Sequence, residues 1–247
     1  MKRTILYFAA VAIMALVFAS CERNDIELTT PGDNDSISQD TPTGPGEWVD
    51  LGLPSGLLWY SCNLGANAPE EYGDYYAWGE IEPKSEYTWA TYRYATVDSN
   101  GNAEILSKYN SKDYWGPVDN LTTLEPEDDA ATVILANGAR IPTESEWREL
   151  LANTTRECTT MNNVHGVKFT ADNGNVIFLP AAGYSDYDTL NWEGHVGFYW
   201  ASDLELSGNT FAYDFEFDWG SNGTGYTHQM CRYNGQSIRP VKSGNKK

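Results

Sequence analysis

The chain has 247 residues, with 35 acidic side chains against 16 basic ones and a formal net charge of −19 at pH 7. A surface this acidic repels phosphate backbones, which excludes nucleic acid as a partner. The length suffices for one ordinary domain with a sizeable core, in addition to terminal segments of another kind.

The N-terminus has the layout of an export signal. Lys2 and Arg3 are followed by an uncharged apolar run over residues 5–18 and then by the small residues Ala19 and Ser20. This order predicts a secretory signal peptide over residues 1–20. The apolar run is shorter than the roughly 20 residues that a membrane-spanning helix needs, so a permanent transmembrane helix is the weaker interpretation.

Residues 18–21, Phe-Ala-Ser-Cys, resemble a bacterial lipobox, in which the cysteine is acylated and becomes the new N-terminus. Lipidation of Cys21 would anchor the protein in the outer membrane of a diderm bacterium, at the cell surface. Two or three acyl chains hold a protein far more firmly than one. The alternative is ordinary cleavage after Ser20, which would leave a free thiol at Cys21.

A composition change separates an N-terminal tether from the folded domain. Residues 21–46 are rich in Thr, Pro, Gly, Asp and Ser and contain no aromatic residue, so they cannot bury enough apolar surface to become ordered. Aromatic residues begin abruptly at Trp48. We therefore predict a lipidated N-terminus and flexible linker over 21–46, one domain over 47–242 and a frayed tail over 243–247.

The first part of the domain predicts short strands and loops. Two apolar stretches, 48–51 and 57–59, flank Leu-Pro-Ser-Gly at 53–56, which favours a hairpin around a type I turn. Residues 75–78 predict another short strand. Residues 87–112 are aromatic and polar without a clear period, so we expect a loop with short elements.

A first helix is expected from Pro126 to about Ala136. Proline suits the first turn of a helix, and the acidic residues that follow it suit the positive end of the helix dipole. Asn137 and Gly138 indicate where the helix ends. The acidic cluster over 125–129 has a second interpretation, as a cation site.

A second helix has a stronger signature. Thr143 and Glu146 have the spacing of a capping box, and Trp147, Leu150 and Leu151 then share one face of the helix.

The pattern after this helix is that of antiparallel strands. Residues 164–170 and 176–179 flank an Asn-Gly turn signal and predict a hairpin, and residues 198–201 predict a further strand. Over 211–219 aromatic residues alternate with Ala212, Asp214, Glu216 and Asp218, which places the rings of Phe211, Phe215 and Phe217 in the core and the acids on the solvated face. Short helices followed by antiparallel strands predict an α+β domain.

Six stretches, in order, resemble the Fibrobacter succinogenes major paralogous domain family: WVDLGLPSGLLW (48–59), YAWGE (76–80), LEPEDDAA (124–131), RIPTESEW (140–147), IFLPAAGY (177–184) and GQSIRPV (235–241). Such domains occur mostly on secreted or lipid-anchored proteins. RIPTESEW and SIRP (237–240) are also similar to segments of formylglycine-generating enzymes. This resemblance implies a C-type-lectin-like fold, with a small core and long loops for binding.

The sequence gives little support for catalysis. Formylglycine-generating enzymes need two neighbouring cysteines near the C-terminus to bind copper, but here Cys231 is alone in that region, so no catalytic residue is carried over. Cys62, Cys158 and Cys231 have no CxxC spacing; export permits one disulfide among them without indicating the pair.

Metal binding has equally little support. The three histidines, His165, His195 and His228, are isolated and lack the spacing of zinc ligands, so we expect surface or loop positions for them. Asp214, Glu216 and Asp218 lack the glycine and glutamate positions of a calcium loop. We expect no catalytic residue, no metal and no cofactor.

The segments 184–192 and 219–233 combine Tyr and Trp with Asn, Asp, Ser and Gly, which is the composition of adaptable recognition loops. Flat aromatic rings also suit stacking on sugar faces. The alternative is that these rings cover the core beneath the loops. The residues expected to contact a ligand are Tyr184, Asp186, Tyr187, Asp188, Trp192, Trp219, Asn222, Tyr226, Arg232 and Tyr233.

The leading hypothesis is therefore a non-catalytic, lipid-anchored surface or periplasm-facing protein that binds a glycan or another envelope or host protein, as in adhesion. A second hypothesis is a structural or accessory subunit of a surface assembly such as a fimbria. A third is an enzyme related to the formylglycine-generating oxidases.

Overall fold

The computed structural model describes residues 46–221 and 223–244. The predicted signal peptide, the lipidation site Cys21, nearly all of the linker and Asn222 lie outside the described residues. Within them the chain is mostly β, with two short helices and several small antiparallel sheets, in broad agreement with the α+β prediction. No helix of the described part has the length and apolarity to cross a membrane.

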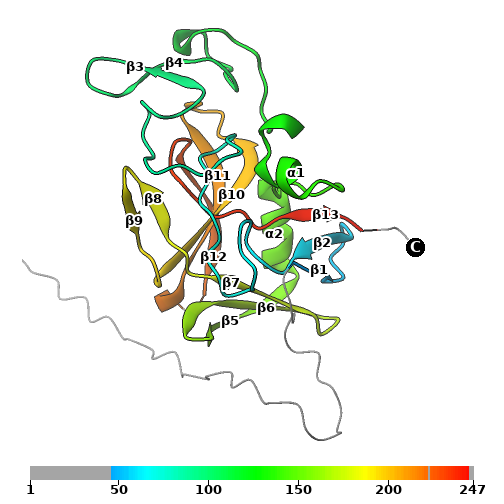
Figure 1. Ribbon diagram of the computed structural model, residues 1–247. Helices are drawn as coiled ribbons and strands as arrows, with labels where there is room; N and C mark the ends of the chain where they lie inside the picture. Colours follow the sequence, from blue (N-terminus) through cyan, green and yellow to red (C-terminus); the bar gives the residue numbers. More distant parts are fainter. Residues whose placement is uncertain (1–45, 222, 245–247) are drawn as a thin grey trace, which may run out of the picture.

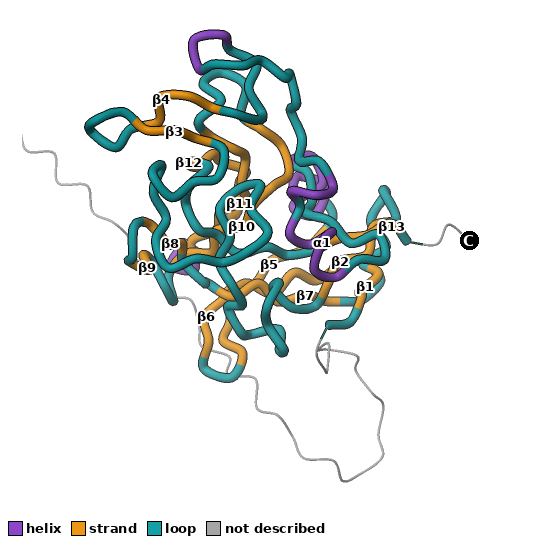
Figure 2. The backbone as a smooth tube through the Cα atoms, turned by 45° about the horizontal axis from the view of Figure 1, so that its top comes forward, coloured by secondary structure: helices purple, strands orange, loops and turns teal. Residues whose placement is uncertain are grey.

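Five small sheets make up the domain, and long loops join them (Figures 1 and 2). Three of the sheets have three strands, ordered β1-β2-β13, β5-β6-β7 and β10-β11-β12, and two are hairpins, β3-β4 and β8-β9. The strands are β1 (Trp48–Asp50), β2 (Leu57–Tyr60), β3 (Ala95–Val97), β4 (Ala103–Leu106), β5 (Thr154–Met161), β6 (Val164–Ala171), β7 (Val176–Pro180), β8 (Tyr184–Asp186), β9 (Thr189–Asn191), β10 (Val196–Leu204), β11 (Phe211–Asp218), β12 (Gly225–Cys231) and β13 (Val241–Ser243).

The hairpin expected around residues 53–56 is confirmed, because β1 and β2 pair antiparallel and Gly56 N donates to Leu53 O. The short strand expected over 75–78 is wrong: Tyr76 forms only an isolated bridge with Gln236. The side chains of Tyr76 and Trp78 are both buried, so this apolar stretch is a core segment rather than a sheet strand.

The first predicted helix is interrupted. A 3-10 turn spans Pro126–Asp128, and the α-helix α1 covers only Ala130–Leu135, because Asp129 is extended and caps it by accepting from Thr132 N at 3.0 Å. The second helix, α2 (Glu144–Ala152), has both halves of the predicted capping box. Here Glu146 also pairs with Arg140 (Nη1 to Oε2, 2.7 Å), so the RIPTESEW stretch serves folding.

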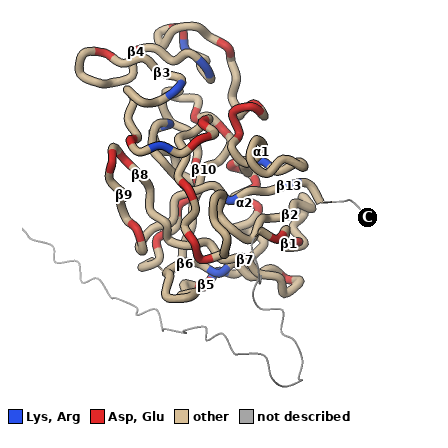
Figure 3. Tube along the Cα trace, viewed as in Figure 1, with Lys and Arg blue, Asp and Glu red and all other residues tan. Residues whose placement is uncertain are grey.

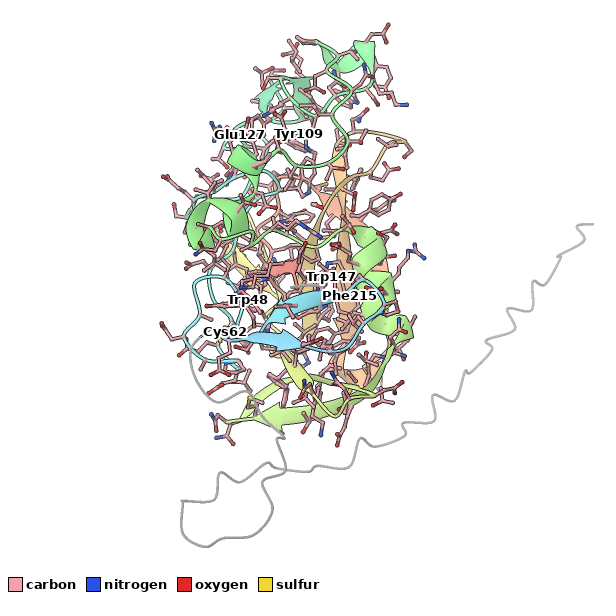
Figure 4. The ribbon with its side chains drawn as sticks, turned by 90° about the vertical axis from the view of Figure 1, so that its right-hand side faces the viewer. Trp48, Cys62, Tyr109, Glu127, Trp147 and Phe215 are labelled. Carbon is pink, nitrogen blue, oxygen red and sulfur yellow. The ribbon has the colours of Figure 1, made fainter. Side chains whose placement is uncertain are left out.

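Two groups of buried side chains form the interior. The first, which we name the apolar cluster, packs α2 against the sheets through tryptophan, phenylalanine and aliphatic residues. Trp147 lies at its centre, stacked on Phe215 with ring centroids 4.7 Å apart and tilted on Trp59 at 4.8 Å (Figure 4). The buried members are Leu51, Leu53, Trp59, Trp147, Leu150, Cys158, Val167, Phe169, Ala171, Ile177, Leu179, Ala181, Tyr199, Ala201, Phe215, Phe217 and Val241.

The second group, which we name the tyrosine cluster, lies in the other part of the domain, around Tyr109 (Figure 4). It holds buried charges between its rings: Asp128 accepts hydrogen bonds from the hydroxyls of Tyr94 (2.5 Å) and Tyr109 (2.6 Å) and from Lys108 (2.6 Å). Its buried members are Leu64, Tyr76, Ala77, Trp78, Tyr87, Tyr92, Tyr94, Tyr109, Ala130, Ala131, Ile141, Trp200, Leu204, Ala212 and Ile238.

The sheet β10-β11-β12 lies between the two clusters, so its second face is also covered at Ala212 and Asp214. Phe215 and Phe217 point into the apolar cluster, as predicted, whereas Ala212 on the opposite face packs into the tyrosine cluster. The prediction of a solvated face is therefore wrong for Asp214, which is fully buried. The core assignment of Phe211 is also wrong, because this ring lies at the end of β11 and is 36% exposed.

Candidate binding site

A pocket of about 490 Å³ lies on the face of the β10-β11-β12 sheet opposite to the apolar cluster. Side chains from all three strands and from the flanking loops line it: Trp192, Val196, Phe198, Glu216, Asp218, Ser221, Thr224 and Tyr226. The pocket and the buried carboxyl of Asp214 thus share one face of the sheet.

Strand register builds the floor of the pocket. Phe198 on β10 lies opposite Glu216 on β11, and Glu216 in turn lies opposite Tyr226 on β12. The neighbouring row places Val196 opposite Asp218. Because side chains alternate along strands, these residues all face the same way. The sheet therefore presents a row consisting of a ring, a carboxylate and a second ring.

The β8-β9 hairpin forms one wall beside this floor. Tyr184 packs edge-on against Phe198, with ring centroids 4.9 Å apart, and Trp192 follows directly after β9. Gly183 allows this close approach: its φ is +68°, and a Cβ there would lie 2.2 Å from the carbonyl oxygen of Asn191.

Two exposed aromatic residues of this region have left-handed backbones. Trp192 (φ 58°) and Tyr187 (φ 54°) are each 61% exposed. Such a conformation costs on the order of 1–3 kcal/mol for a bulky residue and concentrates at functional sites. At Tyr187 the two-residue turn between β8 and β9 accounts for the positive φ. At Trp192 burial of the ring does not offset the cost, which makes Trp192 a candidate for contact with a ligand.

The pocket is electronegative. Glu216 accepts from the Tyr226 hydroxyl at 2.8 Å, and Asp218 accepts from Gly220 N at 2.7 Å and from the Ser221 hydroxyl at 3.0 Å. Desolvation and the neighbouring carboxylates, Glu216 above all, raise the pKa of Tyr226 to about 12. Acidic positions outnumber basic ones over the domain as a whole (Figure 3).

Asp214 lies next to the pocket in the adjacent row of the sheet, opposite His228 on β12. Its Oδ2 accepts from Gln236 at 3.0 Å, whereas its Oδ1 has no hydrogen-bond partner and lies 3.9 Å from His228 Nδ1. Burial above all, together with the nearby charge of Glu216, raises the pKa of the Asp214 carboxyl to about 8, although the hydrogen bond from Gln236 acts in the opposite direction. Asp214 is therefore protonated at neutral pH.

The predicted ligand contacts fall into three groups. Trp192 and Tyr226 line the pocket, and Tyr184 supports it through Phe198. Tyr187 and Asp188 are exposed at the tip of the β8-β9 hairpin. The remaining described residues of the prediction contact the protein itself and lie outside the lining: Asp186, Trp219, Arg232 and Tyr233.

The prediction that Arg232 contacts a ligand is wrong, because its side chain is completely buried. Its guanidinium donates to the Tyr92 hydroxyl at 2.9 Å and to the carbonyl oxygens of Lys108, Tyr109 and Asn209. It is therefore a core residue of the tyrosine cluster. Trp219 is half-buried and stacks on His165 at 4.0 Å; His165 belongs to strand β6 and is half-buried.

Cys62 and Cys231 carry free thiols, so neither takes part in the disulfide that export would permit. The thiol of Cys158 donates a hydrogen bond to the carbonyl oxygen of Trp219. Burial, above all, raises the pKa of the Cys231 thiol to about 11. Within the described ranges no group of three His, Cys, Asp or Glu side chains could hold a metal ion.

In the acidic stretch 125–129, the alternative cation site, Asp128 and Asp129 have partners within the protein. Asp129 caps α1, and Asp128 is neutralised by Lys108 and two tyrosine hydroxyls.

Sequence reasoning missed the floor of the pocket. Phe198 was expected only as part of a strand, and Glu216 and Asp218 only as the solvated face of another. The alternation over 211–219 does place both acids opposite to the core. Their position beside Tyr226 follows only from the pairing of β11 with β12, which no local pattern encodes.

Comparison with known proteins gives no relationship: no protein family, curated protein or solved structure matches the chain.

Proposed function

We propose that this protein is a non-catalytic binding protein of the bacterial envelope that captures a glycan or protein ligand in the pocket on the β10-β11-β12 sheet. One observation carries the proposal: Trp192, whose ring is exposed and whose backbone is left-handed, lines a pocket whose floor carries further rings and two carboxylates. Concave sites with aromatic walls and a few convergent polar groups are typical of ligand recognition.

The arrangement favours binding over catalysis. Burial raises the pKa of the Cys231 thiol to about 11, so its surroundings do not favour the thiolate that a copper-dependent oxidase would need. The motif residues shared with formylglycine-generating enzymes act in folding instead. Arg239 of the SIRP segment is fully buried and donates to Asn63 Oδ1 and to the carbonyl oxygens of Tyr60, Ser61 and Phe178.

The rest of the proposal comes from the sequence. An acylated Cys21 and a tether of about 25 residues would hold the domain on the order of 25–30 Å from the outer membrane. The fold would be C-type-lectin-like, in a member of the major paralogous domain family, with the binding loops displayed over a small core. Small sheets joined by long loops are compatible with that fold.

A broad array of glycans and envelope or host proteins tests the proposal, probed with the purified full chain with and without calcium. We expect a ligand whose binding is lost, by at least about tenfold, in the variant Trp192→Ala. The matched control is Tyr114→Ala, which removes a similarly exposed ring (66% exposed) from the 3-10 turn Asp113–Trp115, outside the pocket lining, and should leave binding unchanged.

Absence of any ligand, or equal binding by both variants, would contradict the proposal. Stoichiometric self-association of the purified chain, measured by sedimentation, would support the structural-subunit hypothesis instead.

A further inference from the structure

The described lining of the pocket offers hydrogen-bond acceptors and aromatic faces, but little to donate. The hydroxyl hydrogens of its lining residues are already used within the protein: Ser221 donates to Asp218, Thr224 to the carbonyl of Ser221 and Tyr226 to Glu216. Apart from the indole of Trp192, the side chains of the lining therefore present only acceptors to a ligand.

The two carboxylates of the pocket also lack basic partners. Within the described ranges, no lysine or arginine forms an ion pair with Glu216 or Asp218; the imidazole Nδ1 of His228 lies 3.8 Å from Glu216 Oε2. The Glu216 side chain is only 17% exposed. Two negative charges beside three aromatic rings form an environment that attracts a cation by charge and by ring quadrupole.

Resting on the proposed function, we infer that the pocket takes a cationic group, namely the ammonium of a lysine side chain on a polypeptide partner. An ammonium has three donors and no acceptor, which complements the acceptor-only lining. A neutral sugar hydroxyl can donate to the carboxylates, but it also offers acceptor lone pairs. Among the described lining side chains only the Trp192 indole can donate to these, because the hydroxyl hydrogens of Ser221, Thr224 and Tyr226 are occupied.

A polypeptide suits the position of the pocket as well. Tyr226 belongs to β12, and β12 is an outer strand of its sheet: within the described part of the chain no strand pairs with it on the side away from β11. An extended segment can add to such an edge and direct alternate side chains toward a pocket. The net charge of −19 would further steer a basic segment toward this protein.

Nuclear magnetic resonance titration of the ¹⁵N-labelled full chain tests this inference, with the indole N–H signal of Trp192 as the reporter. The probes are Nα-acetyl-lysine amide, its Nε-trimethyl form, its Nε-acetyl form and N-acetylglucosamine. Trimethylation keeps the positive charge, whereas acetylation removes it at similar length. We expect both charged probes to bind at least about tenfold more tightly than both neutral ones, and high salt to weaken them.

Charge-neutral variants of the pocket sharpen the test. Asp218→Asn should weaken binding of the charged probes about five- to tenfold, and Glu216→Gln at least as much. Glu104→Gln, which neutralises an exposed carboxylate on β4, is the matched control and should change nothing. Because Glu216 is largely buried, the Asp218 variant keeps the test valid even where Glu216→Gln disturbs the fold.

The outcomes separate this inference from the proposed function. Equal affinity for the charged and neutral probes at Trp192 would overturn the inference. The pocket would then still bind ligands, but without a preference for a cation. An array ligand that needs Trp192, together with lysine probes that do not bind, would also overturn the inference alone. An array ligand indifferent to Trp192→Ala would overturn the proposed function.

Discussion

The apolar cluster and the tyrosine cluster stabilise neighbouring parts of one domain by different physics. The apolar cluster buries tryptophan, phenylalanine and aliphatic side chains behind the capped helix α2. The tyrosine cluster buries rings whose hydroxyls bind charged groups, with Asp128 receiving three donors and Arg232 giving four hydrogen bonds. The apolar cluster is stabilised mainly by apolar surface removed from water, and the tyrosine cluster mainly by hydrogen bonds among buried polar groups.

This difference predicts why a truncated side chain lowers the stability of each cluster. Truncation in the apolar cluster leaves a cavity, whose cost grows with the volume lost. Truncation in the tyrosine cluster leaves buried polar groups without partners, whose cost is their desolvation. The tyrosine cluster can therefore hold long loops in place without regular secondary structure, but it depends on every partner.

Trp147→Ala should produce the largest loss of stability. The side chain is fully buried between Trp59 and Phe215, so its truncation leaves a large cavity in the apolar cluster. We expect a decrease of about 3–5 kcal/mol in the free energy of unfolding, measured by urea denaturation. Tyr114→Ala, at an exposed ring, should cost less than about 0.5 kcal/mol. A similar cost for both variants would refute the placement of Trp147.

Arg232→Met should cost about 2–4 kcal/mol in the same assay. Methionine fills much of the volume but leaves the carbonyl oxygens of Lys108, Tyr109 and Asn209 without their donor. Arg148→Met is the control, because the Arg148 side chain is 64% exposed and pairs only with Glu144 on the helix surface. An unchanged free energy of unfolding in Arg232→Met would mean that the hydrogen bonds of Arg232 do not stabilise the tyrosine cluster.

Asp214→Asn should change how stability depends on pH. The raised pKa of about 8 means that the folded state keeps a proton which the unfolded state releases near pH 4. Stability of the wild type therefore falls as pH rises between those values, by on the order of 2 kcal/mol from pH 6 to pH 8. The variant should lack this decrease.

His228 and Glu216 face Asp214, so His228→Gln and Glu216→Gln in the wild-type background control for their own titration. Parallel pH profiles for the wild type and Asp214→Asn would contradict the assignment of a protonated Asp214.

Thr143→Ala should have the smallest effect, about 1 kcal/mol, since it removes one half of the capping box of α2. Thermal unfolding at several urea concentrations measures this difference. Thr122→Ala, at an exposed loop position, serves as the control and should be near neutral. An equal effect of both substitutions would show that the cap does not stabilise α2.

The same contrast explains which parts of the fold the sequence could predict. The capped helix and the hairpins at 48–60 and 164–180 carry local patterns, namely capping spacing, turn residues and period-two apolarity, and all three were confirmed. Residues 87–112 have no period because their tyrosines bind partners far along the chain. Tyr109, for example, reaches Asp128, and such pairs are fixed by tertiary contacts alone.

The candidate site was predictable in part for the same reason. Trp192 and Tyr226 stood out as rings among small polar residues, which is a compositional signal of the local segment. Asp214 was misplaced because alternation identifies a core face but does not reveal that the opposite face is covered too. Arg232 was misplaced because nothing local distinguishes a buried arginine from an exposed one.

The most direct test of the central claim is a chemical-shift map of the full chain with its array ligand. We expect the perturbed amide signals to cluster over residues 184–198 and 216–228, around Trp192 and Tyr226. The amide signals of the β3-β4 hairpin should keep their chemical shifts. Perturbations that instead concentrate on β3-β4 or on the β1-β2-β13 sheet would contradict it.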